Sequence, residues 1–298
     1  MKKSIFRKAG FLAAAAFFCV GCNDGGDNDN TNGEADAFLK WINDATYYVH
    51  FYGGGNYTSV MANYGTEITL EGARKQNGYL FTGWNTKSDG TGTTYGAGER
   101  YTVTSEVSFN AMYINIDMVY VTGNVDAGVG NFSIGRYEVT QKLWKAVMGN
   151  SNNPSNITGN DSLPVERVSW DDVQKFIGAL NDRTGEKYRL PTAAEWEFAA
   201  RSGINADGNI INVDTVAWHV GNSENKTHIV GTKQSNTLNI YDMFGNVREW
   251  VNDKFGELET DTGYLIYGGS FSEEADTYSR TYGTQSYRDI DLGFRLAK

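Results

Sequence analysis

The position of its two cysteines is the feature that most constrains this chain. Cys19 and Cys22 both lie within the first 22 of its 298 residues. No disulfide and no thiolate-bound metal can therefore lie within residues 23–298, and no cysteine of that stretch can act as a nucleophile. The fold must be stabilised by packing and hydrogen bonds instead. At 13% aromatic, the sequence supplies enough large side chains for a sizeable core.

The N-terminus has the pattern of a secretion signal. The first eight residues carry four basic side chains, and the next twelve form an apolar run that is too short to span a bilayer. Gly21 and Cys22 follow, and this pair resembles the cleavage site of bacterial lipoproteins, in which the cysteine carries the lipid. We therefore expect residues 1–21 to be a signal peptide and Cys22 to be lipidated. Cys19 stands where such signals usually have leucine, so an ordinary secretory signal cleaved nearby is the alternative.

Residues 22–37 are rich in Asn, Asp and Gly and offer no apolar anchor, which predicts a disordered tether. The remaining ~260 residues suit two domains. Cleavage after Gly21 would remove four positive charges and change the formal net charge from −10 to −14. So acidic a chain is not expected to bind nucleic acid through nonspecific phosphate contacts. No later segment is long and apolar enough to cross a membrane, so we expect membrane attachment through the lipid alone.

Within residues 38–116, a short lead-in that could form a helix spans residues 38–46. From Tyr47 the chain follows a β pattern, in which apolar and polar residues alternate and glycine-rich turns separate the runs. Five phrases stand out, at residues 54–55, 65–70, 78–86, 90–95 and 109–113. Together they resemble the Listeria–Bacteroides repeat, also called the internalin B-repeat. That family is a small β-grasp-like module of bacterial surface proteins. The resemblance implies a spacer or contact module and not an enzyme.

Residues 117–298 carry the punctuation of helices. Three capping signals, each typical of the start of a helix, are followed by an amphipathic pattern. They predict a helix over residues 141–148 and two more helices further along the chain. The capping residues are Thr140, the pair Ser169 and Asp172, and the pair Thr192 and Glu195. Short strands and loops fill the remainder. Helices first and irregular strands afterwards indicate an α+β domain and not a parallel α/β sheet.

Seven phrases occur in a fixed order across this second region. They span residues 118–121, 134–140, 163–170, 188–201, 241–250, 268–271 and 292–295. Together they resemble the sulfatase-modifying-factor domain of the formylglycine-generating-enzyme family. Members of that family adopt a C-type-lectin-like fold with little regular secondary structure. We therefore expect an α+β, C-type-lectin-like domain over residues 117–298, preceded by the small β-grasp-like repeat.

The thiol-oxidising members of this family bind copper(I) through two cysteines, three and eight residues after the serine of the Gly-Gly-Ser phrase. Here that serine is Ser270, and the two positions hold Glu273 and Tyr278. Copper(I) is a soft ion that prefers thiolates, so the oxidase chemistry is expected to be absent. A second branch uses histidine-bound iron. His219 and His228 have no carboxylate at a suitable spacing, so we expect them to be solvated or structural, and the protein not to be an enzyme.

The resemblance also implies a calcium site. In the family enzyme, backbone carbonyls and one glutamate surround the ion, which suits a hard cation. The matching residues here are Phe244, Gly245, Val247 and Glu249. The alternative is that Glu249 pairs with an arginine in a loop without metal, and no other cofactor is expected. The charged residues inside the seven phrases should be buried or half-buried partners that hold long loops in place. They are Arg136, Glu138, Glu166, Arg201, Glu249 and Arg295.

Residues 271–291 lie between two phrases and show no apolar periodicity. Tyrosines stand there among small polar and charged residues, as in antibody paratopes. The segment resembles the variable proteins of diversity-generating retroelements, which diversify residues between Gly-Gly-Ser and an ending like residues 292–297. We expect an exposed ligand-binding face, and the alternative is a fixed polar loop without a partner. The expected contact residues are Phe271, Ser272, Glu273, Glu274, Asp276, Tyr278, Arg280, Tyr282, Thr284, Gln285, Ser286, Tyr287, Asp289 and Asp291.

The sequence thus predicts a lipoprotein of the cell envelope, anchored by its lipid and exposed at the surface. It would display a non-catalytic binding face to an extracellular protein or glycan. The first alternative is an enzyme of the formylglycine-generating or sulfur-oxidising family with different chemistry. The second alternative is a structural envelope protein without a specific ligand.

Overall fold

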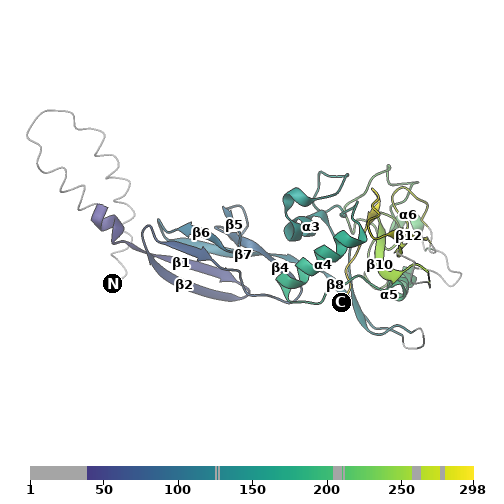
Figure 1. Ribbon diagram of the computed structural model, residues 1–298, viewed down its shortest axis with the longest axis horizontal. Coiled ribbons are helices and arrows are strands. Elements are labelled where there is room, and N and C mark those ends of the chain that lie inside the picture. The colour runs from purple at the N-terminus through teal and green to yellow at the C-terminus, as the bar shows by residue number, and fades with distance from the viewer. Residues whose placement is uncertain are drawn as a thin grey trace, which may run out of the picture.

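The computed structural model describes residues 39–124, 126, 128–203, 210, 212–256, 263–275 and 279–298. The expected signal peptide, the tether with Cys22, and Asp276 and Tyr278 of the expected binding face lie outside the described residues. Figure 1 shows an elongated molecule, in which a domain of strands lies beside a C-terminal domain of helices and strands. No helix in the described part is long and apolar enough to cross a bilayer.

The N-terminal domain consists of two sheets. The larger has the strand order β2-β1-β7-β4-β5, in which β1 and β7 are parallel and the other neighbours are antiparallel. The smaller pairs β3 with β6. The strands are β1 (Thr46–Gly53), β2 (Asn56–Asn63), β3 (Glu67–Leu70), β4 (Tyr79–Asn85), β5 (Thr94–Tyr95), β6 (Glu99–Thr102) and β7 (Val107–Asn115).

Alternation along β1 decides which side chains enter the core of this domain. Val49 is fully buried, and Phe51 stacks against the buried Phe109 of β7 with ring centroids 5.6 Å apart. The Gly54-Gly55 turn has φ values of 60° and 75°. Such left-handed conformations favour glycine and suit the twist of a two-residue hairpin, so β2 returns directly alongside β1.

The C-terminal domain mixes helices with a four-stranded sheet of order β12-β11-β10-β13. A separate two-stranded sheet pairs β8 with β9. The elements are β8 (Met118–Val121), β9 (Phe132–Gly135), α3 (Gln141–Met148), η2 (Asn150–Asn152), α4 (Trp170–Thr184), α5 (Ala193–Ala200), η3 (Arg201–Gly203), α6 (Val213–Val216), β10 (Arg248–Lys254), β11 (Gly263–Tyr267), β12 (Arg280–Thr284) and β13 (Leu292–Gly293).

The three expected helix starts are confirmed. The Thr140 side chain caps α3. Ser169 and Asp172 form a complete capping box at the start of α4, and Thr192 and Glu195 form another at the start of α5. In each box, the side chain of the first residue accepts from the backbone of the third helical residue, and the acid accepts in return. Backbone groups that a helix leaves unpaired are thereby satisfied.

A buried arginine joins distant parts of the C-terminal domain. Arg295 is 0% exposed and donates to both carboxylate oxygens of Glu249 at 2.6 to 2.9 Å. It also donates to the backbone carbonyls of Gly135, Tyr241 and Asp242. One side chain therefore ties β9, β10, the loop before β10 and the C-terminal segment together.

The other charged residues expected inside this domain divide into two groups. Glu138 and Glu166 are buried, and the half-buried Arg136 pairs with Asp117 at 2.8 Å. These fit the expectation of partners within the scaffold. Arg201 contradicts it, because its side chain is 68% exposed. This arginine lies in η3, where the chain leaves the end of α5 at the surface.

The two domains share an apolar cluster. Leu80 of β4 and Ile116, which follows β7, are buried in the same cluster as Phe176 of α4. Arg183, in the last turn of α4, donates to the Phe81 carbonyl at 2.8 Å. Helix α4 therefore packs against β4 of the N-terminal domain.

Candidate binding face

The segment expected to bind a ligand follows an edge of the C-terminal sheet. Among the described strands, β12 pairs with β11 and leaves its other edge open. Four of its five residues are exposed, and Gly283 alone is buried. The side chains of this strand therefore face away from the core.

Most of the expected contact residues are exposed. They are Ser272, Glu274, Arg280, Tyr282, Thr284, Gln285, Ser286 and Tyr287. Glu273 and Asp289 are half-buried. Phe271 and Asp291 contradict the expectation, because they are 1% and 4% exposed and cannot form part of an outer face.

Their contacts explain this burial. The Phe271 carbonyl accepts from the Ser223 hydroxyl at 2.6 Å. Asp291 accepts from the hydroxyls of Ser270 and Ser272 at 2.7 and 3.0 Å. Phe271 is the last residue of one scaffold phrase, and Asp291 directly precedes the next, so both belong to the scaffold that supports the face.

Arg248 organises the acidic part of the face, although sequence reasoning did not select it. Its guanidinium lies 2.9 Å from Asp289 and 3.9 Å from Glu273, and it hydrogen-bonds to Asp291. Burial alone would lower the pKa of Arg248, but hydrogen bonding to Asp291 and the charge of that carboxylate raise it overall. Arg248 precedes the buried Glu249 on β10, so its side chain points to the other side of the strand. The alternation of side chains along this strand is the sequence signal that could have identified Arg248 as part of the face.

Glu273 occupies the position at which the thiol oxidases have their first cysteine. Its Oε2 atom is buried without a hydrogen-bond partner among the described residues. Burial raises the pKa of Glu273, while the charge of Arg248 acts in the opposite direction. Close by, the Tyr287 hydroxyl donates to Asp289 at 2.7 Å, and this hydrogen bond raises the pKa of Tyr287. The site is thus a network of carboxylates around one guanidinium.

A separate exposed aromatic pair lies on the other face of this sheet, because the strand registers place Tyr282 on the side of Glu249 and not of Arg248. The rings of Tyr282 and Phe255 stack with centroids 3.8 Å apart and planes 7° apart. Tyr282 is 55% exposed and Phe255 is 41% exposed. Sequence reasoning missed Phe255, because it lies outside residues 271–291 and only the pairing of β11 with both β10 and β12 brings it there.

The backbone beneath the face is held in place. A Cβ atom on Gly283 would lie 2.7 Å from the Tyr287 ring and 2.9 Å from Trp250, so glycine is required. Arg288 pairs at 2.7 Å with Asp172, the capping residue of α4. Exposed side chains therefore project from a backbone that is fixed to the helix and to the core.

Glu249 does not fit the expected calcium site. Both of its carboxylate oxygens accept from Arg295, and Oε2 also accepts from the Trp196 ring nitrogen at 2.7 Å. A carboxylate neutralised by a buried guanidinium is not free to bind a cation. Glu249 instead pairs with Arg295, which is the alternative that the sequence had left open. No cluster of three metal-ligating acids, histidines or cysteines occurs within the described ranges.

The two histidines of this domain have structural contacts. His219 is 8% exposed and lies 2.8 Å from Asp214. His228 stacks on Trp218 at 3.7 Å and hydrogen-bonds to the Ser223 carbonyl at 2.8 Å. Each ring is held by residues that are near it in the chain, as expected for structural histidines.

Comparison with known proteins assigns both domains. Residues 112–298 match the sulfatase-modifying factor enzyme 1-like domain. This chain belongs to that family. Residues 47–112 match the Listeria-Bacteroides repeat domain. Both resemblances predicted from the sequence are confirmed, and the mixed α and β C-terminal domain is the C-type-lectin-like domain of the sulfatase-modifying factor family.

Relatives within the sulfatase-modifying factor family differ in activity. The chain is 32% identical to "Chaperone protein LppX" of Paenibacillus barcinonensis, with 52% of this chain and 74% of that protein covered. It is 27% identical to "Inactive C-alpha-formylglycine-generating enzyme 2" of Bos taurus, with 53% and 57% covered. It is 32% identical to "Formylglycine-generating enzyme" of Streptomyces coelicolor, with 48% and 55% covered. The chain thus spans little more than half the length of these last two, and both active and inactive members match.

A solved structure resembles the chain over most of its length. Treponema denticola variable protein 1 superposes with a TM-score of 0.53 at 25% identity, with 85% of this chain and 98% of that protein covered. The resemblance to variable proteins, predicted from the segment between residues 271 and 291, is therefore confirmed at the level of structure.

Proposed function

We propose that this member of the family is a surface-exposed lipoprotein that binds an extracellular protein or glycan and catalyses no reaction. The observation that carries this proposal is the face built on residues 271–291. Eight of its expected contact residues are exposed, while Gly283 and the Arg288–Asp172 pair fix the backbone beneath them. Antibody paratopes likewise bind their ligands through contact side chains that vary on a fixed scaffold.

The absence of thiolates supports a non-catalytic role. The chain has cysteines only at positions 19 and 22. Glu273, at the first cysteine position of the oxidases, lies beside Arg248 and is an oxygen donor that a soft copper(I) ion disfavours. The rival proposal is an enzyme with different chemistry. Incubation with Cu(I), oxygen and a cysteine-containing sulfatase peptide tests it, because any formylglycine detected by mass spectrometry would favour the enzyme.

The chemistry of the face suggests what it would bind. The Tyr282–Phe255 pair offers a flat apolar surface that suits a sugar ring or an apolar side chain. On the other face of the sheet, Arg248 and the carboxylates of Asp289 and Glu273 offer donors and acceptors. The segment thus offers one apolar and one polar contact surface, and each suits part of a protein or glycan ligand.

The N-terminal parts complete the proposal. Cys22 would carry a lipid, residues 22–37 would form a tether, and the N-terminal domain, in a β-grasp-like arrangement, would act as a spacer. A Cys22→Ser variant that remained in the membrane fraction would contradict the proposal that Cys22 carries the lipid anchor.

Diversification of the face is part of the same proposal. A reverse-transcriptase gene nearby, with a near-copy of the DNA that encodes residues 268–298, would support it.

Alanine variants of the face test the binding role. Tyr282→Ala and Tyr287→Ala should each fold like wild type and weaken binding to a ligand found on glycan and surface-protein arrays. A central anchor would cost about 2 kcal/mol, or about 30-fold in affinity. Tyr120→Ala is the matched control, since Tyr120 is 64% exposed on β8. If both face variants bind like Tyr120→Ala, the binding-face proposal fails.

A further inference from the structure

One strand of the N-terminal domain is left with an open edge. β2 ends the five-stranded sheet, and none of the described strands pairs with its outer side. Seven of its eight residues are exposed. The unpaired N–H and C=O groups of such an edge are a template for a further strand.

β2 also lacks the features that normally protect an edge. Its sequence, NYTSVMAN, contains no charge and no proline. By contrast, β5 at the other edge has only two residues, and the small sheet carries Glu67, Glu99 and Arg100. Short length and charge are the usual protection against edge pairing. Among the edge strands of the N-terminal domain, β2 alone is both long and uncharged.

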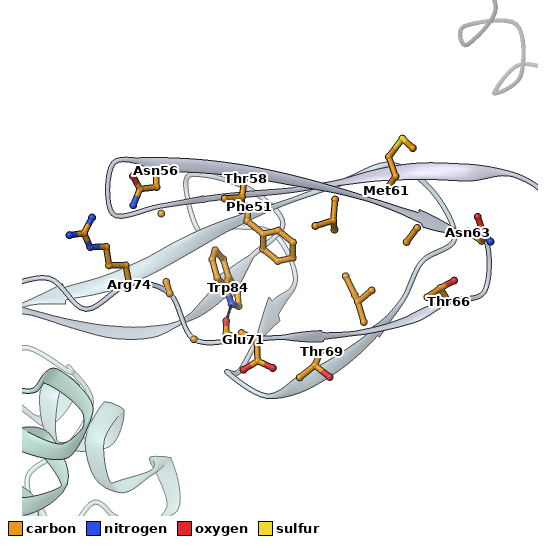
Figure 2. Close-up of a pocket in the computed structure, with 16 residues that line it drawn as sticks. Phe51, Asn56, Thr58, Met61, Asn63, Thr66, Thr69, Glu71, Arg74 and Trp84 are labelled. Atoms are coloured by element: carbon orange, nitrogen blue, oxygen red, sulfur yellow. Dashed lines mark hydrogen bonds between the residues drawn. The ribbon is translucent and has the colours of Figure 1, made fainter.

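Both faces of this edge carry exposed apolar side chains. On the outer face, Tyr57 and Met61 are 56% and 64% exposed, and Figure 2 shows Met61 pointing away from the groove. On the inner face, Val60 is 46% exposed above a groove of about 830 Å³. Figure 2 shows Phe51 and Trp84 within this groove, between the β1–β2 hairpin and β3. A strand added beside β2 would cover apolar surface on both of its sides.

We propose that β2 pairs with β2 of a second copy, antiparallel, about a twofold axis at Ser59. Opposed residues of an antiparallel pair share a face, so the two strands can align only in registers that keep the inner face inside. With the axis at Ser59, Tyr57 of each copy faces Met61 of the other. Thr58 of each copy then faces Val60 of the other.

The pairing at Ser59 is self-complementary. It repeats one aromatic–methionine contact and one contact between β-branched side chains twice each, and both kinds are favourable. An axis at Val60 would instead place Tyr57 opposite Asn63 and leave Met61 opposite Ser59. An uncharged strand meets no repulsion from its own copy. These features favour a second copy over an unrelated peptide.

The dimer goes beyond the proposed ligand binding and does not depend on it. β2 and β12 lie in different domains, well apart in Figure 1. A dimer through β2 would therefore leave both binding faces open, and two faces on one particle increase avidity for a ligand with repeated sites.

Cysteine cross-linking in membranes of cells that express the full chain tests the dimer. Ser59 of one copy would lie directly opposite Ser59 of the other, within disulfide reach, so Ser59→Cys with copper phenanthroline should give at least ~10-fold more covalent dimer than a control. Ser105→Cys is the matched control, because Ser105 is an exposed serine of the same domain away from β2. The wild-type chain gives the background from Cys19 and Cys22.

A second variant separates edge pairing from random collision. Val60→Lys, added to Ser59→Cys, places a charge on the edge and should reduce cross-linking to the Ser105→Cys level without changing the melting temperature. Three results would overturn the proposal. They are equal yields at Ser59 and Ser105, a cross-link that survives Val60→Lys, and a cross-link of Ser59→Cys to a different protein.

Discussion

Single buried residues make the C-terminal domain sensitive to pH. Glu138, Asp242 and Glu249 are buried carboxylates that share the single buried guanidinium of Arg295. Burial, followed by the charge of Asp242, raises the pKa of Glu138 well above its usual range, and burial raises that of Asp242 to about 6. Elsewhere in the domain, burial raises the pKa of Glu166 to about 7. As the pH rises, Glu138, Asp242 and Glu166 therefore keep their protons to a higher pH in the folded state than in the unfolded chain.

Glu166 gives the clearest pH prediction. In the unfolded chain its proton leaves near the ordinary value of 4.5, but in the folded state only near 7, so stability falls as pH rises through this window. Glu166→Gln stays neutral and should remove up to about 3 kcal/mol of that fall. In urea unfolding, variant and wild type should agree near pH 4.5 and the variant should be the more stable near pH 8. Parallel pH profiles would contradict the assignment.

Removing the buried guanidinium should destabilise the domain strongly. Arg295→Met leaves Glu249, at 1% exposure, without its ion-pair partner, and frees the three carbonyls that Arg295 holds. Breaking one partner of a buried pair costs about 3–5 kcal/mol. Arg201→Met is the control, because that side chain is 68% exposed and should change stability by less than ~0.5 kcal/mol. Similar urea midpoints for the two variants would refute the role of Arg295.

At the scale of elements, local signals were predictive and long-range pairing was not. Thr140 and Ser169 mark helix starts because their side chains bond within the next turn. The sheet of β10 to β13 could not be derived, since β10 pairs in parallel with β13 from far along the chain. Residues 271–291 were correctly expected to be mostly exposed. Arg248 and Phe255 were missed, because only the long-range pairing of the strands brings them to this region. Phe271 and Asp291 were assigned to the face because sequence alone does not show where a loop returns to the core.

The cap of α4 should have a measurable effect on stability. Ser169 is 1% exposed, and its hydroxyl accepts from the Asp172 backbone at 3.1 Å. Ser169→Ala removes this bond and should lower the free energy of unfolding by about 1 kcal/mol. Ser105→Ala, at an exposed loop position, should leave it unchanged within ~0.5 kcal/mol. Chemical denaturation compares them, and equal stabilities would show that the cap is dispensable.

At the scale of the whole molecule, the two domains share one apolar cluster. Leu80 and Ile116 are buried against side chains of α4, and Lys75 donates to the Asp182 carbonyl at 2.9 Å. An N-terminal domain that is packed in this way would hold the proposed binding face at a fixed orientation relative to β2. We therefore expect the repeat and the C-terminal domain to unfold together.

Arg183 is the residue on which this coupling can be tested. It donates to the Phe81 carbonyl of β4 and to the Ala146 carbonyl of α3, so Arg183→Ala removes a bond on each side of the junction. Losing them should cost about 1–3 kcal/mol. Calorimetry should then show the single transition of wild type split, with the N-terminal domain melting first. Arg100→Ala is the matched control, since Arg100 is 74% exposed in a surface pair with Glu67, and such pairs contribute at most about 1 kcal/mol. A single transition in Arg183→Ala at the midpoint of Arg100→Ala would mean that the shared apolar cluster couples the domains without this arginine.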